Sequence, residues 1–135
     1  MIKFIDHIGL VVQDIESSLK LFTEALGLKL SEVENNDRFK VRIAFLPVGD
    51  TLVELIQPTA EGTMMANILK DRGESIHHIA FRVDDLEAEL ANLKAKGVAL
   101  IHQTPQSGGL GARIAFLDPS AGNGVSIELV EKKQT

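Results

Sequence analysis

The chain has 135 residues, of which 44% are hydrophobic and 24% charged, the size and composition of one soluble globular domain. Its net charge of −5 argues against a basic surface for nucleic acid or anionic membranes, and the absence of cysteine excludes disulfides, thiolate metal ligands and a cysteine nucleophile. The N-terminus has the pattern of a strand rather than a secretion signal, and no apolar run approaches the roughly 20 residues that span a bilayer. We therefore expect a cytoplasmic protein that contacts neither nucleic acid nor membrane.

The first half of the chain predicts the element order βαβββ. An apolar strand over 8–12 leads to Asp14, a residue type that favours a helix N-cap, and Gly27 stands where a helix C-terminus favours positive φ. Between them, four apolar residues recur at helical spacing: Ile15, Leu19, Phe22 and Leu26. Three strand-like segments follow, at 29–34, 39–46 and 51–57.

The second half predicts the same order after a linker. The segment 58–74 holds a short apolar pattern that favours one more helix. A strand over 78–83 then leads to Asp85, again suited to an N-cap, and the next helix ends near Gly97. Its apolar residues are Leu86, Leu90 and Leu93, and the later strands are expected at 99–103, 113–117 and 125–130.

The two halves are copies of one another. IDHIGLVVQDIESSL from Ile5 matches IHHIAFRVDDLEAEL from Ile76, and RIAFL occurs at 42–46 and again at 113–117, both 71 positions apart. VEL around Glu54 matches IEL around Glu128, 74 positions apart. We interpret the chain as a single α+β domain, 1–135, of two tandem βαβββ modules in a curved mixed sheet. Module one spans about 1–60, the linker about 58–74 and module two about 75–131.

The repeat relates two histidines and two glutamates on apolar strands. Side chains alternate between the faces of a strand, so His7 and His78 share a face with the small residues Gly9 and Ala80 and lie opposite the large apolar residues that should meet the helices. Each glutamate lies among apolar residues, where an unpaired carboxylate would be costly. Two imidazoles and two carboxylates without sulfur suit one divalent ion of the Mn, Fe, Co, Ni or Zn series. The predicted ligands are His7, Glu54, His78 and Glu128.

Other polar residues have simpler interpretations. His77 is expected on the opposite face from His78 with a structural role, and His102 at the surface. Alternation places Arg42, Arg82 and Arg113 on the inner face, where they could pair with a carboxylate, or at strand ends, where they could bend into solvent.

Four stretches of the sequence, taken in order, resemble the methylmalonyl-CoA epimerase family of the vicinal oxygen chelate (glyoxalase/bleomycin resistance/dioxygenase) superfamily. They are HIGLVVQDIE, GDTLVELIQPT, IHHIAFRVDD and FLDPSAGNGVSIELVE, and they cover nearly the whole chain. Glyoxalase I shares the His…Glu…His…Glu ligand order, but ELIQPT, the double histidine and the long turn from Asp118 to Gly124 are closer to the epimerases. Asp118 and Ser120 stand where a histidine and a lysine are common in that family.

The resemblance implies a glyoxalase-like fold, a homodimer and a metal-dependent isomerase. The implied reaction is 1,1-proton transfer at the carbon α to the thioester of methylmalonyl-CoA through a metal-stabilised enolate. Such a reaction needs an acid and a base on opposite faces of that carbon, and Glu128 and Glu54 are the expected pair.

Two alternatives stay open. A glyoxalase I-type lyase acting on a hemithioacetal also needs metal-assisted proton transfer. A metal-free protein that binds a small molecule, as bleomycin-resistance proteins do, would lack the ligand set. Extradiol dioxygenases and fosfomycin thiol transferases use three protein ligands, so Glu54 as a fourth argues against both.

Overall fold

A computed structural model describes residues 1–133 of the chain, and these residues form two compact units. One unit spans His7–His77, and the other combines Met1–Asp6 with the chain from His78 onward. Strands β1 (Ile2–Val11) and β5 (Ser75–Val83) each pass from one unit into the other. The start of the chain therefore packs with its second half.

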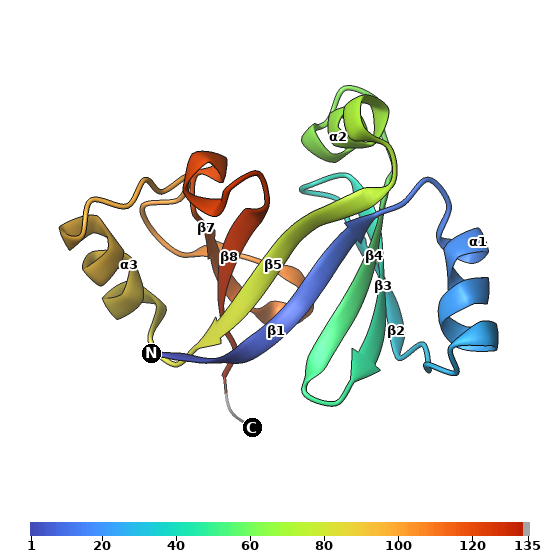
Figure 1. Ribbon diagram of the computed structural model, residues 1–135, viewed down its shortest axis with the longest axis horizontal. Helices are drawn as coiled ribbons and strands as arrows, with labels where there is room; N and C mark the ends of the chain where they lie inside the picture. The colour runs from blue at the N-terminus through green and yellow to red at the C-terminus, as the bar shows by residue number, and fades with distance from the viewer. Residues whose placement is uncertain (134–135) are drawn as a thin grey trace. The chain divides into compact units, whose positions relative to one another are not determined.

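The unit His7–His77 holds the first βαβββ module (Figure 1). Its strands are β2 (Glu32–Asn36), β3 (Val41–Val48), β4 (Thr51–Pro58) and the C-terminal part of β1, in the order β2-β3-β4-β1. β1 is parallel to β4, whereas β2, β3 and β4 pair antiparallel, so the sheet is mixed. Helix α1 (Ile15–Leu19) continues as a π-helical segment, Lys20–Ala25, and α2 (Met64–Arg72) follows β4.

Strand alternation gives this sheet two apolar faces. One packs on α1 through a buried cluster of Val12, Ile15, Ala44, Leu46 and Leu55. The other face carries a second cluster, Val41, Ile43, Phe45 and Ile56, against which Met65 of α2 packs. Because both faces are apolar, a polar side chain on either face of this sheet is surrounded by hydrocarbon.

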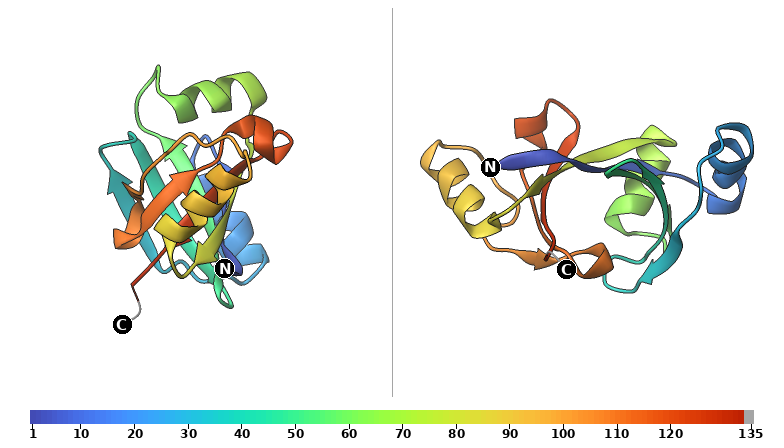
Figure 2. Two further views of the ribbon diagram at one scale, coloured as in Figure 1. Left: turned by 90° about the vertical axis from the view of Figure 1, so that its left-hand side faces the viewer. Right: turned by 90° about the horizontal axis from the view of Figure 1, so that it is seen from below.

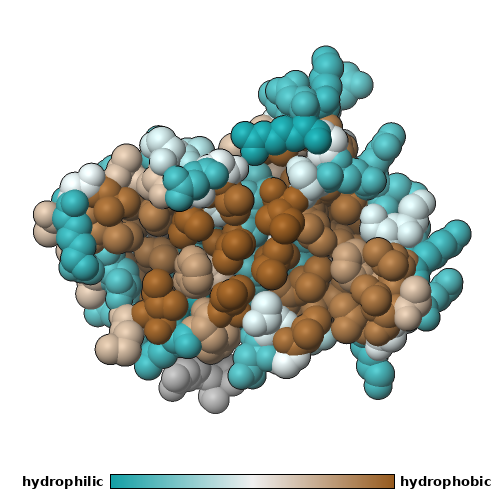
Figure 3. Space-filling model, viewed as in Figure 1, coloured by the Kyte–Doolittle hydropathy of each residue, from teal (hydrophilic) through white to brown (hydrophobic). Residues whose placement is uncertain are grey.

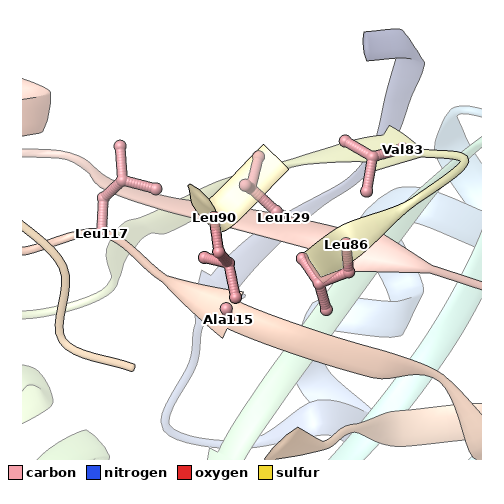
Figure 4. Close-up of a cluster of buried hydrophobic side chains, with 6 residues drawn as sticks. All are labelled: Val83, Leu86, Leu90, Ala115, Leu117 and Leu129. Carbon is pink, nitrogen blue, oxygen red and sulfur yellow. The ribbon is translucent and has the colours of Figure 1, made fainter. Parts of the chain in front are cut away.

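The second unit repeats the arrangement. Helix α3 (Leu86–Ala95) follows β5, and then come β6 (Gln106–Ser107), β7 (Arg113–Phe116) and β8 (Ser126–Glu131), in the spatial order β5-β8-β7-β6. Figure 2 shows α3, in yellow, beside the strands of this unit. β5 is parallel to β8, and β6, β7 and β8 pair antiparallel. The helix-side core consists of Val83, Leu86, Leu90, Ala115, Leu117 and Leu129 (Figure 4). The predicted α+β fold of two βαβββ modules is confirmed.

One local prediction was wrong, and Asp14 occupies the N-cap position of α1 as predicted but without a capping hydrogen bond. The strand expected at 99–103 makes one isolated bridge, between Leu100 and Leu117, and β6 forms later, at Gln106–Ser107. Proline at 105 cannot donate to a ladder, which helps to explain why the pairing is short. Asp14 does not cap α1 with its side chain, whereas Asp85 accepts a hydrogen bond from the Ala88 amide at 3.1 Å.

Gly27 and Gly97 end their helical segments with φ of 77° and 78°, as the sequence predicts. No helix in residues 1–133 is long and apolar enough to cross a membrane. The start of the chain exposes four apolar side chains, those of Met1, Ile2, Phe4 and Ile5. Figure 3 shows hydrophobic side chains gathered on the face drawn there.

Candidate metal centre

His7 and Glu54 form a buried pair in the unit His7–His77. His7 lies on β1 opposite Leu52 of the parallel strand β4, and Glu54 lies two residues further along, opposite Gly9. The His7 Nδ1 and Glu54 Oε2 atoms are 3.2 Å apart, and the residues are 6% and 7% exposed. A glycine opposite Glu54 leaves space for the carboxylate to turn towards the imidazole.

His78 and Glu128 repeat that geometry in the other unit. His78 lies on β5 opposite Ser126 of β8, and Glu128 lies two residues further along, opposite Ala80. The His78 Nε2 and Glu128 Oε2 atoms are 3.1 Å apart, and both residues are 4% exposed. The duplication therefore extends beyond sequence words to strand register: in each unit a small residue stands opposite the glutamate.

Phe116 packs against the second pair. Its ring meets the His78 ring edge-on, with centroids 5.5 Å apart and planes at 77°, and Phe116 is the cross-strand partner of Glu128 on β7. Such a contact fixes the plane of an imidazole without competing for its nitrogens.

The chemistry of these donors fits a divalent cation. Each unit offers one imidazole nitrogen and one carboxylate oxygen within 3.2 Å of each other, and burying a carboxylate is costly unless it is paired or binds metal. His7, Glu54 and His78 all present donor atoms of the kind that hold a metal ion. A second acidic group, Asp85, Glu87 and Glu131, is at least partly exposed, and two of its members, Glu87 and Glu131, pair with Arg113. It lacks the imidazoles of a transition-metal site.

Of the two remaining histidines, His77 agrees with its predicted role, whereas His102 does not lie at the surface as predicted. His77 is 5% exposed, in keeping with a structural role. His102 is partly buried: its Nδ1 accepts a hydrogen bond from the Phe116 amide at 3.0 Å, and its ring meets the Phe116 ring edge-on. His102 thus supports the phenylalanine that packs on His78, a role that only the fold reveals.

The expectation that Arg42 and Arg113 share the inner face was wrong. Arg42 binds Glu16 of α1 at 2.6 Å, and Arg113 binds Glu87 of α3 and, at 2.8 Å, Glu131. Their alternation partners Ala44 and Ala115 belong to the helix-side cores, so both arginines reach the helices. Arg82 follows Ala80 onto the opposite face, where Ala80 packs with Ile114 and Val130.

Comparison with known proteins places this geometry in a family. The family model described as the glyoxalase/bleomycin resistance protein/dioxygenase superfamily matches residues 6–116. The mitochondrial methylmalonyl-CoA epimerase of Dictyostelium discoideum is 32% identical, over 95% of this chain and 78% of its own. A Vibrio cholerae protein named "Probable lactoylglutathione lyase" is also 32% identical, over 95% of this chain and 90% of its own.

A solved structure gives the same result. A variant of Streptomyces coelicolor methylmalonyl-CoA epimerase in complex with 2-nitronate-propionyl-CoA superposes with a TM-score of 0.92, at 32% identity, covering 99% of this chain and 100% of that one. The chain therefore belongs to the glyoxalase/bleomycin resistance protein/dioxygenase superfamily and, within it, to the methylmalonyl-CoA epimerase family of isomerases.

Proposed function

We propose that one divalent cation is bound by the four buried donors of the two repeats: His7, Glu54, His78 and Glu128. The observation that carries this proposal is the repetition of one His–Glu pair, with the same register and nearly the same distance, in both units. A single buried pair would be an ordinary hydrogen-bonded ion pair. Two copies in a superfamily member provide a complete set of N and O ligands for an ion of the Mn, Fe, Co, Ni or Zn series.

The reaction proposed is epimerisation of methylmalonyl-CoA by proton transfer at the carbon α to the thioester. When bound, a divalent cation supplies Lewis acidity to the substrate's carbonyl oxygen. Glu128 accepts the α-proton on one face of the carbon, and Glu54 returns a proton to the opposite face, so that the configuration inverts while the bonding is unchanged.

The surroundings of Glu54 support its assignment as the second acid/base group. Its cross-strand neighbour is Phe45, and Ile43 and Ile56 lie in the same buried cluster. Among the described residues of that cluster no side chain can carry a proton, so the acid/base groups beside it are Glu54 and its partner His7, and of the two only the glutamate offers a carboxylate.

The substrate class rests on the relatives. A Streptomyces coelicolor relative is an epimerase that binds an acyl-CoA analogue, and the match spans its full length. An acyl-CoA thioester is therefore the ligand we propose for this chain. The exposed apolar side chains of Ile2 and Ile5 on β1 further support the homodimer that the family resemblance implies, since exposed apolar surface can mark an interface.

The test is an assay of metal-loaded protein with two substrates. Incubation of one methylmalonyl-CoA epimer in deuterium oxide should give the other epimer with deuterium at the α-carbon. Methylglyoxal with glutathione, the substrate mixture of the second candidate, should give little or no lactoylglutathione. The opposite pattern would assign the chain to the lyase activity named for the Vibrio cholerae relative, and inactivity on both would overturn the proposed reaction.

A further inference from the structure

Residues 1–6 and 78–133 contain a cavity of about 770 Å³ that the proposed chemistry does not use. Its cationic lining residues are Lys3, Arg82, Lys132 and Lys133, and its acidic ones are Asp84 and Glu131. This concentration of positive charge stands out because the whole chain carries a net charge of −5. The lining of the cavity thus has more cationic than acidic side chains, the opposite of the chain as a whole.

A buried carboxylate holds two of these cations in place. Asp6 is 1% exposed, and its Oδ1 accepts hydrogen bonds from Arg82 Nε at 2.8 Å and lies 2.7 Å from Arg82 Nη2 and 3.3 Å from Lys132 Nζ. One carboxylate cannot neutralise two cations, so the group keeps a net positive charge. The Arg82 guanidinium also lies over the Phe4 ring, 5.0 Å from its centre, which holds the guanidinium flat.

The two acidic lining residues are already engaged. Glu131 accepts the Leu86 amide at 2.8 Å and binds Arg113, so its carboxylate turns towards α3. Asp84 lies 3.7 Å from Lys3. Lys132 is tied to Asp6, and Lys133 is exposed at the end of the described chain. The cavity is thus suited to an anion with more than one negative charge.

The position of the cavity relative to the candidate ligands suggests which anion. Arg82 follows His78 by four residues on β5, and Lys132 follows Glu128 by four along β8 and its continuation. Residues i and i+4 of a strand share a face and are roughly 13 Å apart. Arg82 therefore lies on the same face as His78, at a distance that the pantetheine arm of CoA can span, and Lys132 binds the same Asp6 carboxylate as Arg82.

We propose that Arg82, Lys132 and Lys133, with Lys3 at the rim, bind the phosphate groups at the nucleotide end of an acyl-CoA. The identity of the ligand as an acyl-CoA rests on the proposed function, whereas the binding of phosphate is inferred from the cationic side chains alone. Guanidinium and ammonium groups are the usual protein ligands of phosphate, and the platform of Arg82 on Phe4 offers a flat surface for the adenine ring.

The test measures binding of adenosine 3′,5′-bisphosphate, which has no thioester, by titration calorimetry. Replacement of two lysines, Lys132→Gln with Lys133→Gln, leaves Arg82 to compensate Asp6, so the fold should persist. The double variant should bind the bisphosphate at least about tenfold more weakly than the unaltered protein, and more salt should weaken the binding of the unaltered protein. The matched control, Lys29→Gln, removes an exposed charge from the other unit and should bind normally.

Two further arms separate the possible sources of a signal. Inorganic phosphate should compete only weakly if the nucleotide matters, whereas equal competition would reduce the site to a simple phosphate site and overturn its assignment to CoA. Where epimerase activity is present, the double variant should raise KM for methylmalonyl-CoA relative to KM for the same acyl group on pantetheine alone. Equal bisphosphate affinity in the double variant and the unaltered protein would overturn the proposal, even if the epimerase activity is found. If the unaltered protein binds the bisphosphate, the double variant does not, and the unaltered protein has no epimerase activity, the subsite is supported and only the proposed reaction is contradicted.

Discussion

At the scale of single residues, Glu128 combines two proposed roles that a substitution can separate. Its carboxylate lies 3.1 Å from His78 in a buried setting, so it can serve as a ligand and as a proton acceptor. A glutamine has the same shape and keeps an oxygen donor, but it cannot take up a proton at neutral pH.

We expect Glu128→Gln to retain much of its metal while the rate of α-proton exchange falls by about a hundredfold or more. The measurement is solvent-deuterium incorporation into methylmalonyl-CoA by metal-loaded protein, alongside metal analysis. His78→Ala is the comparison, since removing a neutral donor should reduce metal content and exchange together. Near-normal exchange in metal-loaded Glu128→Gln would leave Glu128 as a ligand alone.

At the scale of elements, the duplicated helices are held at their first turns in different ways. Asp85 accepts the Ala88 amide and so satisfies one of the free donors of α3. Asp14, its counterpart in the repeat, instead accepts the Ser17 hydroxyl at 2.8 Å, and this hydrogen bond lowers the pKa of the Asp14 carboxyl. The Ile15 amide is satisfied by Gln57 of β4 rather than by a cap.

Asp85→Ala should therefore lower the free energy of unfolding by about 1 kcal/mol, whereas Asp14→Ala should cost less. Urea unfolding of both variants in the presence of a chelator measures the difference without a contribution from metal binding. Equal losses in the two variants would show that the Asp85 hydrogen bond does not stabilise α3. The pair is well matched because each residue immediately precedes the equivalent helix of its own repeat.

At the scale of the whole molecule, both halves of the proposed ligand set come from one chain. Metal should therefore bind with a stoichiometry of one ion per chain, whether the protein is a monomer or the proposed homodimer. Because the proposed site requires the folded chain, metal should stabilise the folded state by about 2.7 kcal/mol at a free concentration one hundred times Kd.

This prediction is checked by metal titration with thermal unfolding, together with sedimentation to establish the oligomeric state. His7→Ala should lose the metal-dependent rise in Tm, and His102→Ala, outside the proposed ligand set, should keep it. One ion per two chains, or a His7→Ala variant with an undiminished rise, would contradict the proposed ligand set. We also predict that the whole chain is one functional domain, and a stoichiometry of one ion per chain would agree with this prediction.

The sequence by itself determined the features that depend on neighbours along the chain. Duplicated words established the two βαβββ modules, and strand alternation selected His7, Glu54, His78 and Glu128 from the other polar residues, because a period of two is visible in a single strand. The structure brings each His–Glu pair within 3.2 Å.

Only the tertiary structure decided the features that depend on which strands meet. Arg42 and Arg113 turn to the helices, where Glu16 and Glu87 lie, and His102 binds the amide of Phe116, 14 residues later in the chain. Asp6 gave no signal in the sequence, yet its carboxylate binds Arg82 and Lys132, which lie 76 and 126 positions further along the chain. Contacts over such distances follow from strand pairing, which a local pattern of hydrophobicity does not encode.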